Sequence, residues 1–250
     1  TLNLSNTEGT VSQTTFTQPS GTLTGSSDFN ISGNFTWTGG AQTGTGETNA
    51  NGGLTLSGAG GKSLQRTLNN PGLATYSGTG ILTLASPGVF NNLSTATFDA
   101  QGDTALNQFF GGEPFNNQGI FRKSAGAGTM DVSLTLTNTG SVDVQSGALR
   151  LLTGATHTGT FDCTGATLNF GGGTQNLSAL NTLTGTNVTF SGATVNLPGG
   201  YNITGTTSLT GGVANFTGTL AGIGTIQLSN ATLNLSNTEG TVSQTTFTQP

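Results

Sequence analysis

Apolar and polar residues alternate in short runs along most of the chain, and this pattern predicts β-strands with one buried face. The segment DFNISGNFTWTGG (28–40) alternates through Phe29, Ile31, Phe35 and Trp37. Small and polar residues stand between the runs, where they allow tight corners. We expect Phe35 and Trp37 to lie in the core, in preference to forming an exposed platform for sugar stacking.

No stretch repeats its apolar residues at the 3.6-residue spacing of an amphipathic helix, so the pattern predicts no long helix. A short helical turn is expected only within Asp103–Phe110, DTALNQFF. The chain is therefore expected to be all-β.

A strand–corner–strand unit occurs three times, centred on Ala166, Ala193 and Ala231. The copies read TFDCTGATLNF, VTFSGATVNL and IQLSNATLNL. The alignment places Cys163 at the inward position of Phe190 and Leu228, which predicts a small core residue and no reactive thiol.

The same alignment places asparagines between inward residues of the second strand, at Asn169, Asn196 and Asn234. These side chains are expected to point outward. Stacked asparagines hydrogen-bond along a column, so their predicted role is structural.

The spacing of apolar positions distinguishes a solenoid from a sandwich. Leu168 precedes Val188 by 20 residues, and Val188 precedes Leu209 by 21. Neighbouring strands inside that span are too close for sandwich strands with their loops, which recur at about 8–12 residues. The spacing predicts a right-handed parallel β-helix with coils of about 21 residues. Because a single coil buries too little apolar surface to order itself, each coil needs a neighbour.

The first nineteen residues, TLNLSNTEGTVSQTTFTQP, recur without change at Thr232–Pro250. The offset of 231 residues corresponds to roughly 11 coils of about 21 residues. We interpret residues 1–250 as a single continuous β-solenoid, with one 231-residue period and the start of the next. Thr1 is then expected to fall within a coil, and the sequence after Pro250 to resume with SGTLTGSSDF. Continuation is expected through the covalent chain, or otherwise by head-to-tail stacking.

Charge excludes some classes of partner. Charged residues make up 6% of the chain, the net charge is −5, and only five residues are Lys or Arg. A nucleic-acid-binding protein needs a dense basic face, so no nucleic-acid partner is expected. No run of about 18 apolar residues occurs in the sequence, so no membrane span is predicted. A single cysteine provides no internal disulfide, and the Thr-, Asn- and Gly-rich composition is associated with an extracellular location.

Residues for chemistry are sparse. The ten acids are spread along the chain: Glu8, Asp28, Glu47, Asp99, Asp103, Glu113, Asp131, Asp143, Asp162 and Glu239. His157 is expected to be a solvated corner residue without a catalytic partner. The calcium-binding repeat GGxGxDxUx is absent from the sequence. No catalytic, cofactor-binding or metal-binding residue is predicted.

The densest charged neighbourhood contains Asp99, Asp103, Glu113, Arg122 and Lys123, with Phe109, Phe110, Phe115 and Phe121 beside it. We interpret it as a bulging loop whose aromatic residues cover the solenoid and whose charges pair in solvent. The alternative is a partner-binding bulge, with the following candidate residues: Phe109, Phe110, Glu113, Arg122 and Lys123.

The segments FNNQGIFRKSAGAGT (115–129) and LTNTGSVDVQSGALRL (136–151) resemble repeats of large bacterial surface and secreted proteins. Their relatives include β-solenoids of the filamentous-haemagglutinin-like and autotransporter-passenger-like type. The resemblance is clear over about half the chain. It implies a parallel β-helix and a role as an adhesin or a fibre at the cell surface.

The leading functional hypothesis is a structural repeat of an extracellular or cell-surface fibre that continues end to end through identical coils. Its main partner would be another copy of the repeat, and lateral fibre contacts or glycans stay open as further partners. The alternative is an adhesin stalk that binds glycans or cells. A polysaccharide-active enzyme is the less favoured third hypothesis, and we expect no enzymatic activity.

Overall fold

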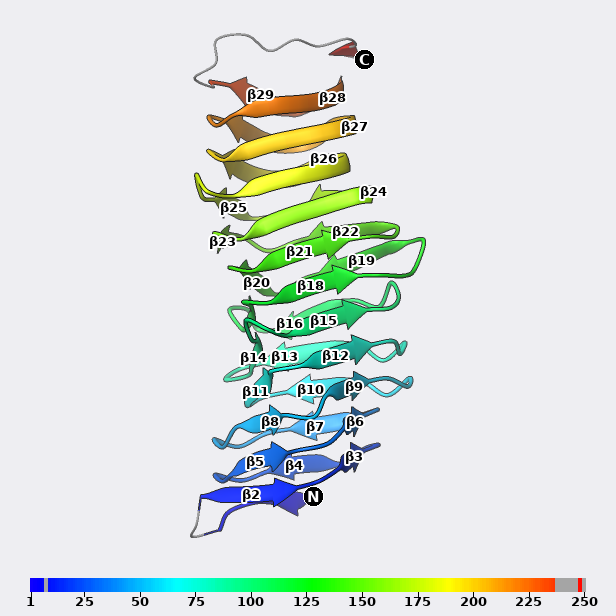
Figure 1. Ribbon diagram of the computed structural model, residues 1–250, viewed down its shortest axis with the longest axis vertical. Coiled ribbons are helices and arrows are strands. Elements are labelled where there is room, and N and C mark those ends of the chain that lie inside the picture. The colour runs from blue at the N-terminus through cyan, green and yellow to red at the C-terminus, as the bar shows by residue number, and fades with distance from the viewer. Residues whose placement is uncertain (7–8, 237–246, 249–250) are drawn as a thin grey trace.

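The structure is a computed structural model of the 250-residue chain that describes residues 1–6, 9–236 and 247–248. These residues form a right-handed parallel β-solenoid of about 12 turns with no helix, which confirms the predicted fold class (Figure 1). Successive strands follow three faces in turn, and with few exceptions a strand pairs in parallel with the strand one turn later.

Face 1 contains β1 (Leu2–Asn3), β4 (Thr22–Thr24), β7 (Gly40–Gln42), β10 (Lys62–Leu64), β13 (Leu82–Ala85), β16 (Leu106–Phe109), β19 (Thr129–Val132), β22 (Ala148–Leu151) and β30 (Phe247–Thr248). Face 2 contains β2 (Thr10–Gln13), β5 (Asp28–Ile31), β8 (Thr48–Ala50), β11 (Thr67–Asn70), β14 (Val89–Asn92), β17 (Pro114–Asn117), β20 (Thr135–Asn138), β23 (Ala155–His157), β25 (Thr174–Leu177) and β29 (Thr232–Leu235). Face 3 contains β3 (Phe16–Gln18), β6 (Phe35–Trp37), β9 (Leu54–Leu56), β12 (Leu73–Tyr76), β15 (Thr97–Ala100), β18 (Ile120–Lys123) and β21 (Ser141–Val144).

Four longer strands bend around corners. These are β24 (Thr160–Phe170) and β28 (Leu220–Leu228), which cover faces 3 and 1, and β26 (Thr182–Leu197) and β27 (Gly200–Phe216), which cover all three faces.

The core is one column that runs along the solenoid axis. Alternating side chains point into it, so like residues stack on like residues from turn to turn. The rings of Phe90 and Phe115 stack at 4.5 Å between centroids, and those of Phe98 and Phe121 at 5.2 Å. Trp37 is completely buried. The predicted core positions of Phe35, Trp37 and Cys163 are confirmed.

Buried asparagines line the corner between face 2 and face 3. In this inner asparagine ladder, Asn70, Asn92, Asn117 and Asn138 each receive or donate amide hydrogen bonds of 2.8 Å. Each side chain also donates to a carbonyl at the start of the next face, such as Ser141 O for Asn117. The ladder therefore satisfies backbone groups that would otherwise be buried without partners.

His157 takes the next position of this inner ladder, so the predicted solvated corner is wrong. Its ring is fully buried, with Nε2 2.8 Å from Oε1 of Gln175. The error arose because the apolar alternation gives no signal for an inward polar residue at a corner.

Outward asparagines form two further ladders on face 2, one over Asn30, Asn49, Asn69, Asn91 and Asn116. The second ladder links Asn176, Asn196, Asn215 and Asn234 through amide hydrogen bonds of 2.7–2.8 Å. The predicted outward columns are thus confirmed at Asn196 and Asn234. Asn169 also points outward, between the buried Leu168 and Phe170, and it accepts a hydrogen bond from Ser191 Oγ of the next turn.

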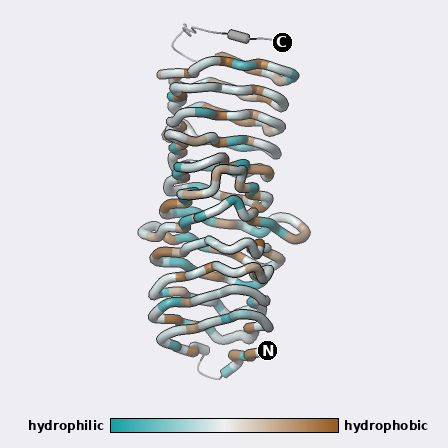
Figure 2. The backbone as a smooth tube through the Cα atoms, turned by 90° about the vertical axis from the view of Figure 1, so that its right-hand side faces the viewer, coloured by the Kyte–Doolittle hydropathy of each residue, from teal (hydrophilic) through white to brown (hydrophobic). Residues whose placement is uncertain are grey.

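Coil length varies because corners absorb extra residues while the stacked strands keep their register. Leu168 pairs with Val188 as expected, but Val188 pairs with Thr207, and Leu209 pairs with Phe190. The expectation that Val188 and Leu209 are equivalent positions of successive coils is therefore wrong, and that coil has 19 residues instead of 21. Longer coils produce loops that stand out at mid-height in Figure 2.

The predicted helical turn within Asp103–Phe110 is wrong, because these residues include strand β16. Leu106 stacks between Leu82 of the turn below and Val132 of the turn above. Burial of this side chain in the stack outweighs the local preference for a turn of helix.

Candidate functional site

The predicted partner-binding residues lie at two different corners. Phe109 and Phe110 stand where face 1 turns into face 2, whereas Arg122 and Lys123 end a strand of face 3. The structure therefore does not bring the five candidate residues together. It gives one exposed aromatic loop and one set of paired charges.

The aromatic loop comprises Phe109, the last residue of β16, and residues 110–113, which lead into β17. The side chain of Phe109 is 57% exposed and that of Phe110 is 94% exposed, with the two rings edge to face at 4.7 Å. Phe110 has a φ of +79°, which is rare for a residue with a side chain, and Gly111 and Gly112 continue at +92° and +97°. This strained turn holds two apolar rings in solvent, which makes the loop a candidate contact site.

Below Phe109, face 1 carries an open hollow of about 560 Å³, which we term the face-1 groove. Its floor is a column of small outward residues in register from turn to turn: Thr22, Ala41, Ser63 and Thr83. Phe109 lies in register with Ala85 and closes one end. The groove thus combines an aromatic ring with the hydroxyl groups of Thr22, Ser63 and Thr83, of which the last two lie on adjacent turns about 4.8 Å apart.

Lys62 contributes to the wall of the face-1 groove, but its charge is directed inward. The side chain is 1% exposed, and its Nζ donates to the carbonyl oxygens of Gly60 and Gly80 at 3.1 and 3.4 Å. Burial lowers the pKa of this ammonium group. Because the other lining residues are uncharged, the surface of the groove is neutral.

Lys123 is fully buried, so the prediction that its charge pairs in solvent is wrong. Its ammonium group donates to the carbonyl oxygens of Ala125, Gly126 and Ser146 at 2.9–3.0 Å. It also lies 2.8 Å from Oδ1 of Asp103. The hydrogen bond from Lys123 holds the pKa of the Asp103 carboxyl below its usual value, with a further contribution from the amide of Gly128. Lys123 therefore fastens two turns at a corner.

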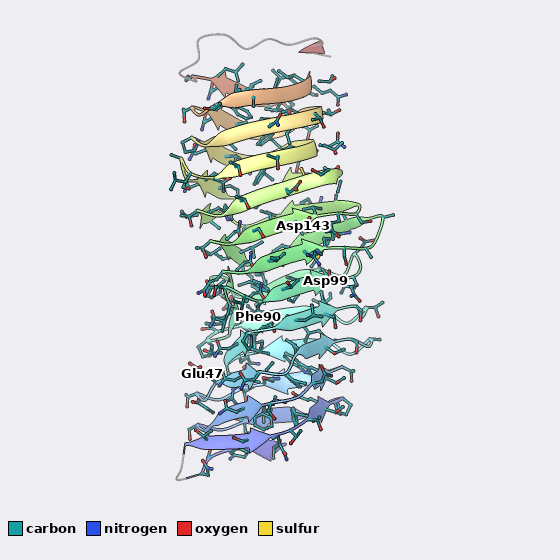
Figure 3. All side chains as sticks on the ribbon, viewed as in Figure 1. Glu47, Phe90, Asp99 and Asp143 are labelled. Atoms are coloured by element: carbon teal, nitrogen blue, oxygen red, sulfur yellow. The ribbon has the colours of Figure 1, made fainter. Side chains whose placement is uncertain are left out.

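Arg122 points outward on face 3, where it is partly exposed and bonds Asp143 through Nε at 3.2 Å. Asp99 occupies the same strand position as Arg122 one turn below, and Asp143 occupies it one turn above. Figure 3 shows Asp99 and Asp143 on the same face. The outward part of face 1 carries the matching pair of Arg150 with Asp131, joined by two hydrogen bonds of 2.7 Å. These charges pair along the stack, as expected for exposed columns of opposite charge.

Glu113 and two aromatic residues also differ from the expectation of a solvated bulge. Glu113 is 4% exposed, and its Oε2 has no hydrogen-bond partner among the described residues. Phe115 and Phe121 are fully buried core residues and do not cover the outside of the solenoid. Glu113 is thus a corner residue, which leaves Phe109 and Phe110 as the exposed candidates.

Sequence reasoning missed the face-1 groove and the buried cations. The outward column of Thr22, Ala41, Ser63 and Thr83 was visible only once the coils were aligned in register. Arg66, 1% exposed, donates to the carbonyl oxygens of Ser27 and Glu47 at 3.1 Å. A pattern of apolar residues does not distinguish such inward cations from surface ones.

Among the described residues no group of three or more His, Cys, Asp and Glu side chains is placed to hold a metal ion. Nor does this part of the chain contain a helix with the length and hydropathy to cross a membrane. Glu8 and Glu239 lie outside the described residues. Comparison with protein-family models, curated proteins and solved structures finds no match.

Proposed function

We propose that this chain is a structural repeat of an extracellular or cell-surface fibre, in which one solenoid repeat continues directly into the next. The observation that carries the proposal is the exact recurrence of nineteen residues together with their preserved orientation. Leu2 and Leu233 both occupy inward positions, and Asn3 and Asn234 both point outward. The repeated segment therefore has the alternation needed to act as another coil in each place.

In a solenoid each coil pairs its backbone with the coils on either side. Strands β1, β2 and β3 pair on one side only among the described strands, with β4, β5 and β6. An unpaired edge exposes backbone donors and acceptors, which another coil of the same width satisfies. A repeat of the same chain supplies such a coil without a separate capping element.

The composition supports a role outside the cell. Outward positions are mostly Thr, Ser and Asn, and the outward Asn columns hydrogen-bond along the axis. Such ladders stiffen a solenoid without depending on charge. Self-association along the axis needs no cofactor, and the proposed function includes no catalytic step.

Electron microscopy of chains with one, two and three copies of the 231-residue repeat tests this proposal. A continuous stack lengthens by about 54 Å per added repeat, given about 4.8 Å for each turn. The width of the particles is expected to stay constant. Particles that widen, bend back or separate into independent bodies would contradict a fibre repeat.

The aromatic loop and the face-1 groove favour a second candidate function, an adhesin that binds a neutral glycan. An exposed aromatic ring stacks on the apolar face of a sugar, and the hydroxyl groups of Thr22, Ser63 and Thr83 offer hydrogen bonds to its edge. Changing Phe109 and Phe110 to Ala is expected to abolish glycan-array binding. Leu180→Ala is the matched control, because Leu180 is an exposed apolar residue, at 90%, away from the groove. Equal loss in the control, or no glycan bound by the unaltered chain, would exclude this function.

A further inference from the structure

We propose that consecutive repeats are turned by one face relative to each other, so that the interface between copies includes a rotation of one third of a turn. The inference rests on the proposed fibre function, because it describes how one repeat receives the next. It follows from where the structure places the two copies of the nineteen-residue segment.

The first copy begins on face 1. Leu2 pairs with Leu23 in β4, and the later part of the same copy reaches face 3, where Phe16 pairs with Phe35 in β6. The segment thus enters on face 1 and leaves on face 3.

The second copy begins on face 2. Leu233 pairs with Ala214, whose neighbours in the turns below are Val195 and Gln175 of face 2. The later part of this copy reaches face 1, where the backbone of Phe247 pairs with Ile226. Both ends of the second copy are displaced by one face in the same direction.

The register gives the number of turns in one repeat. Face 1 carries twelve successive layers from β1 to β28, which are eleven full turns, and the chain then moves on by one face to Leu233. A repeat of 231 residues therefore makes eleven and one third turns, with a mean of about 20 residues each. The fractional turn is what rotates the next copy.

The solenoid tolerates this displacement because each face requires the same alternation of inward and outward residues. On face 2, Leu233 lies over Ala214 and Leu235 lies over Phe216. Ala214 and Phe216 are both buried. Asn234 Nδ2 donates to Asn215 Oδ1 at 2.7 Å and extends the outer ladder of that face. The copy therefore makes native-like contacts in its second position.

The strand–corner–strand units show the same exchange of corners within the repeat. The unit centred on Ala166 turns from face 3 to face 1, since its strand parts pair with β21 and β22. The unit centred on Ala193 turns from face 1 to face 2, with Val188 over Leu168 and Val195 over Gln175. Ala166 and Ala193 are both buried at these different corners. One sequence pattern thus serves two corners of this solenoid.

The rotation sets what the surface of a fibre displays. The aromatic loop and the face-1 groove would appear on face 1 in one repeat, on face 2 in the next and on face 3 in the third. The arrangement returns to face 1 after three repeats, or about 163 Å at about 4.8 Å per turn. A partner that contacts the loop could then approach the fibre from any side.

Paired cysteines in the full 250-residue chain test the position of each copy. Outward residues in register on adjacent strands are close enough for a disulfide. Under mild oxidation we expect a link in Asn3→Cys/Thr24→Cys and in Asn234→Cys/Asn215→Cys. Asn196→Cys/Asn215→Cys is the matched control, one turn earlier in the same column. Burial raises the pKa of the Cys163 thiol to about 11, which keeps it out of the reaction. Formation of the control link without the Asn234–Asn215 link would overturn the displacement.

Imaging separates this inference from the fibre proposal. In a chain in which residues 1–231 are placed three times before the full sequence, gold bound to Phe110→Cys marks each aromatic loop. We expect the labels to follow a spiral, with the fourth directly above the first. Labels in one straight line, about 54 Å apart, would overturn the rotation and leave the fibre intact. Particles without a continuous stack would contradict the proposed function itself.

Discussion

Buried asparagine side chains hold the corner between faces 2 and 3, and they do so by hydrogen bonds that no apolar side chain could make. Asn117 accepts from Asn92 and donates to Asn138 at 2.8 Å. It also donates to the carbonyl oxygens of Gly119 and Ser141. Removal of one such side chain leaves several buried groups without partners.

Asn117→Ala is expected to lower the free energy of unfolding by about 3 kcal/mol, because a buried donor or acceptor left unpaired costs about 1–3 kcal/mol. Asn116→Ala is the matched control. Its side chain points outward and donates to Asn91 at 2.9 Å, where water can replace the bond, so we expect a loss below about 1 kcal/mol. Urea titrations followed by circular dichroism measure both variants, and equal losses would refute the role of the inner asparagine ladder.

His157 continues the inner ladder with a group that titrates. Burial lowers its pKa below the ordinary 6.5, against the opposing effect of its bond with Gln175. The unfolded chain therefore takes up a proton near pH 6.5, where the folded chain does not. Stability from this residue is fully present above that pH and falls as the pH decreases towards the folded-state value.

The urea concentration at the unfolding midpoint of the unaltered chain is accordingly expected to decrease when the pH is lowered from 7.5 to 5.5. In His157→Asn, which restores the residue type of the ladder, the midpoint should change less over this interval. The same titration on both proteins provides the comparison. A pH dependence of equal size in the variant would show that another group is responsible.

At the residue scale, the inward and outward positions could be predicted, but the fate of individual polar residues could not. Alternation correctly placed Trp37 and Cys163 in the core and Asn196 outside. It misplaced His157 and Lys123, because inward polar residues at corners are selected by backbone carbonyls of other turns. Those carbonyls become neighbours only in the folded register.

At the scale of the elements, corners and stacked strands have separate tasks. Strands keep a register that repeats from turn to turn, and corners differ in length and in the polar groups that hold them. Arg122 and Lys123 are adjacent in β18. Lys123 hydrogen-bonds carbonyl oxygens at a corner, whereas Arg122 lies on the outer side of face 3. Comparison of these two residues therefore separates the two tasks.

Lys123→Met is expected to destabilise the solenoid by about 3 kcal/mol, because three carbonyl oxygens lose their donor and each buried acceptor left unpaired costs about 1–3 kcal/mol. Arg122→Met removes a partly exposed pair and should cost less than about 1 kcal/mol. Thermal unfolding of the two variants measures the difference. An equal loss of stability in both variants would contradict the interpretation that the buried Lys123 side chain stabilises the corner.

The pH dependence of the stability of Lys123→Met provides a second test of this interpretation. Because the Lys123 hydrogen bond lowers the pKa of Asp103, its contribution is present above the unfolded value of 3.8 and is lost as the pH falls through the folded value. Lys123→Met should therefore flatten the loss of stability below about pH 4.

Predictions at the element scale succeeded where spacing alone decides the answer. The distance between apolar positions excluded a sandwich and identified a three-sided coil. It could not fix the length of each coil, because insertions near β16 and β19 change the spacing without changing the stack. The aromatic loop was recognised from Phe109 and Phe110, but the face-1 groove beneath it depends on residues from four turns.

At the scale of the whole molecule, stability is shared between neighbouring turns. Each turn contacts only the turns above and below, so an end turn has half the contacts of a central turn. Strand β29 pairs with β27 through residues Thr232–Leu235, and no other described strand pairs with it. If the chain is a fibre repeat, the following copy should stabilise this end in particular.

Hydrogen–deuterium exchange on a two-repeat chain tests that expectation. Peptides that cover residues 220–235 occur once inside the two-repeat chain and once near its end. We expect two isotopic envelopes of equal size, one at the exchange rate of the single repeat and one slower by at least about tenfold. Peptides from residues 136–151, which lie among complete turns in both copies, should give one envelope in both proteins. A single fast envelope for residues 220–235 would mean that the second copy does not stack on the first, since stacking is the only source of the added protection.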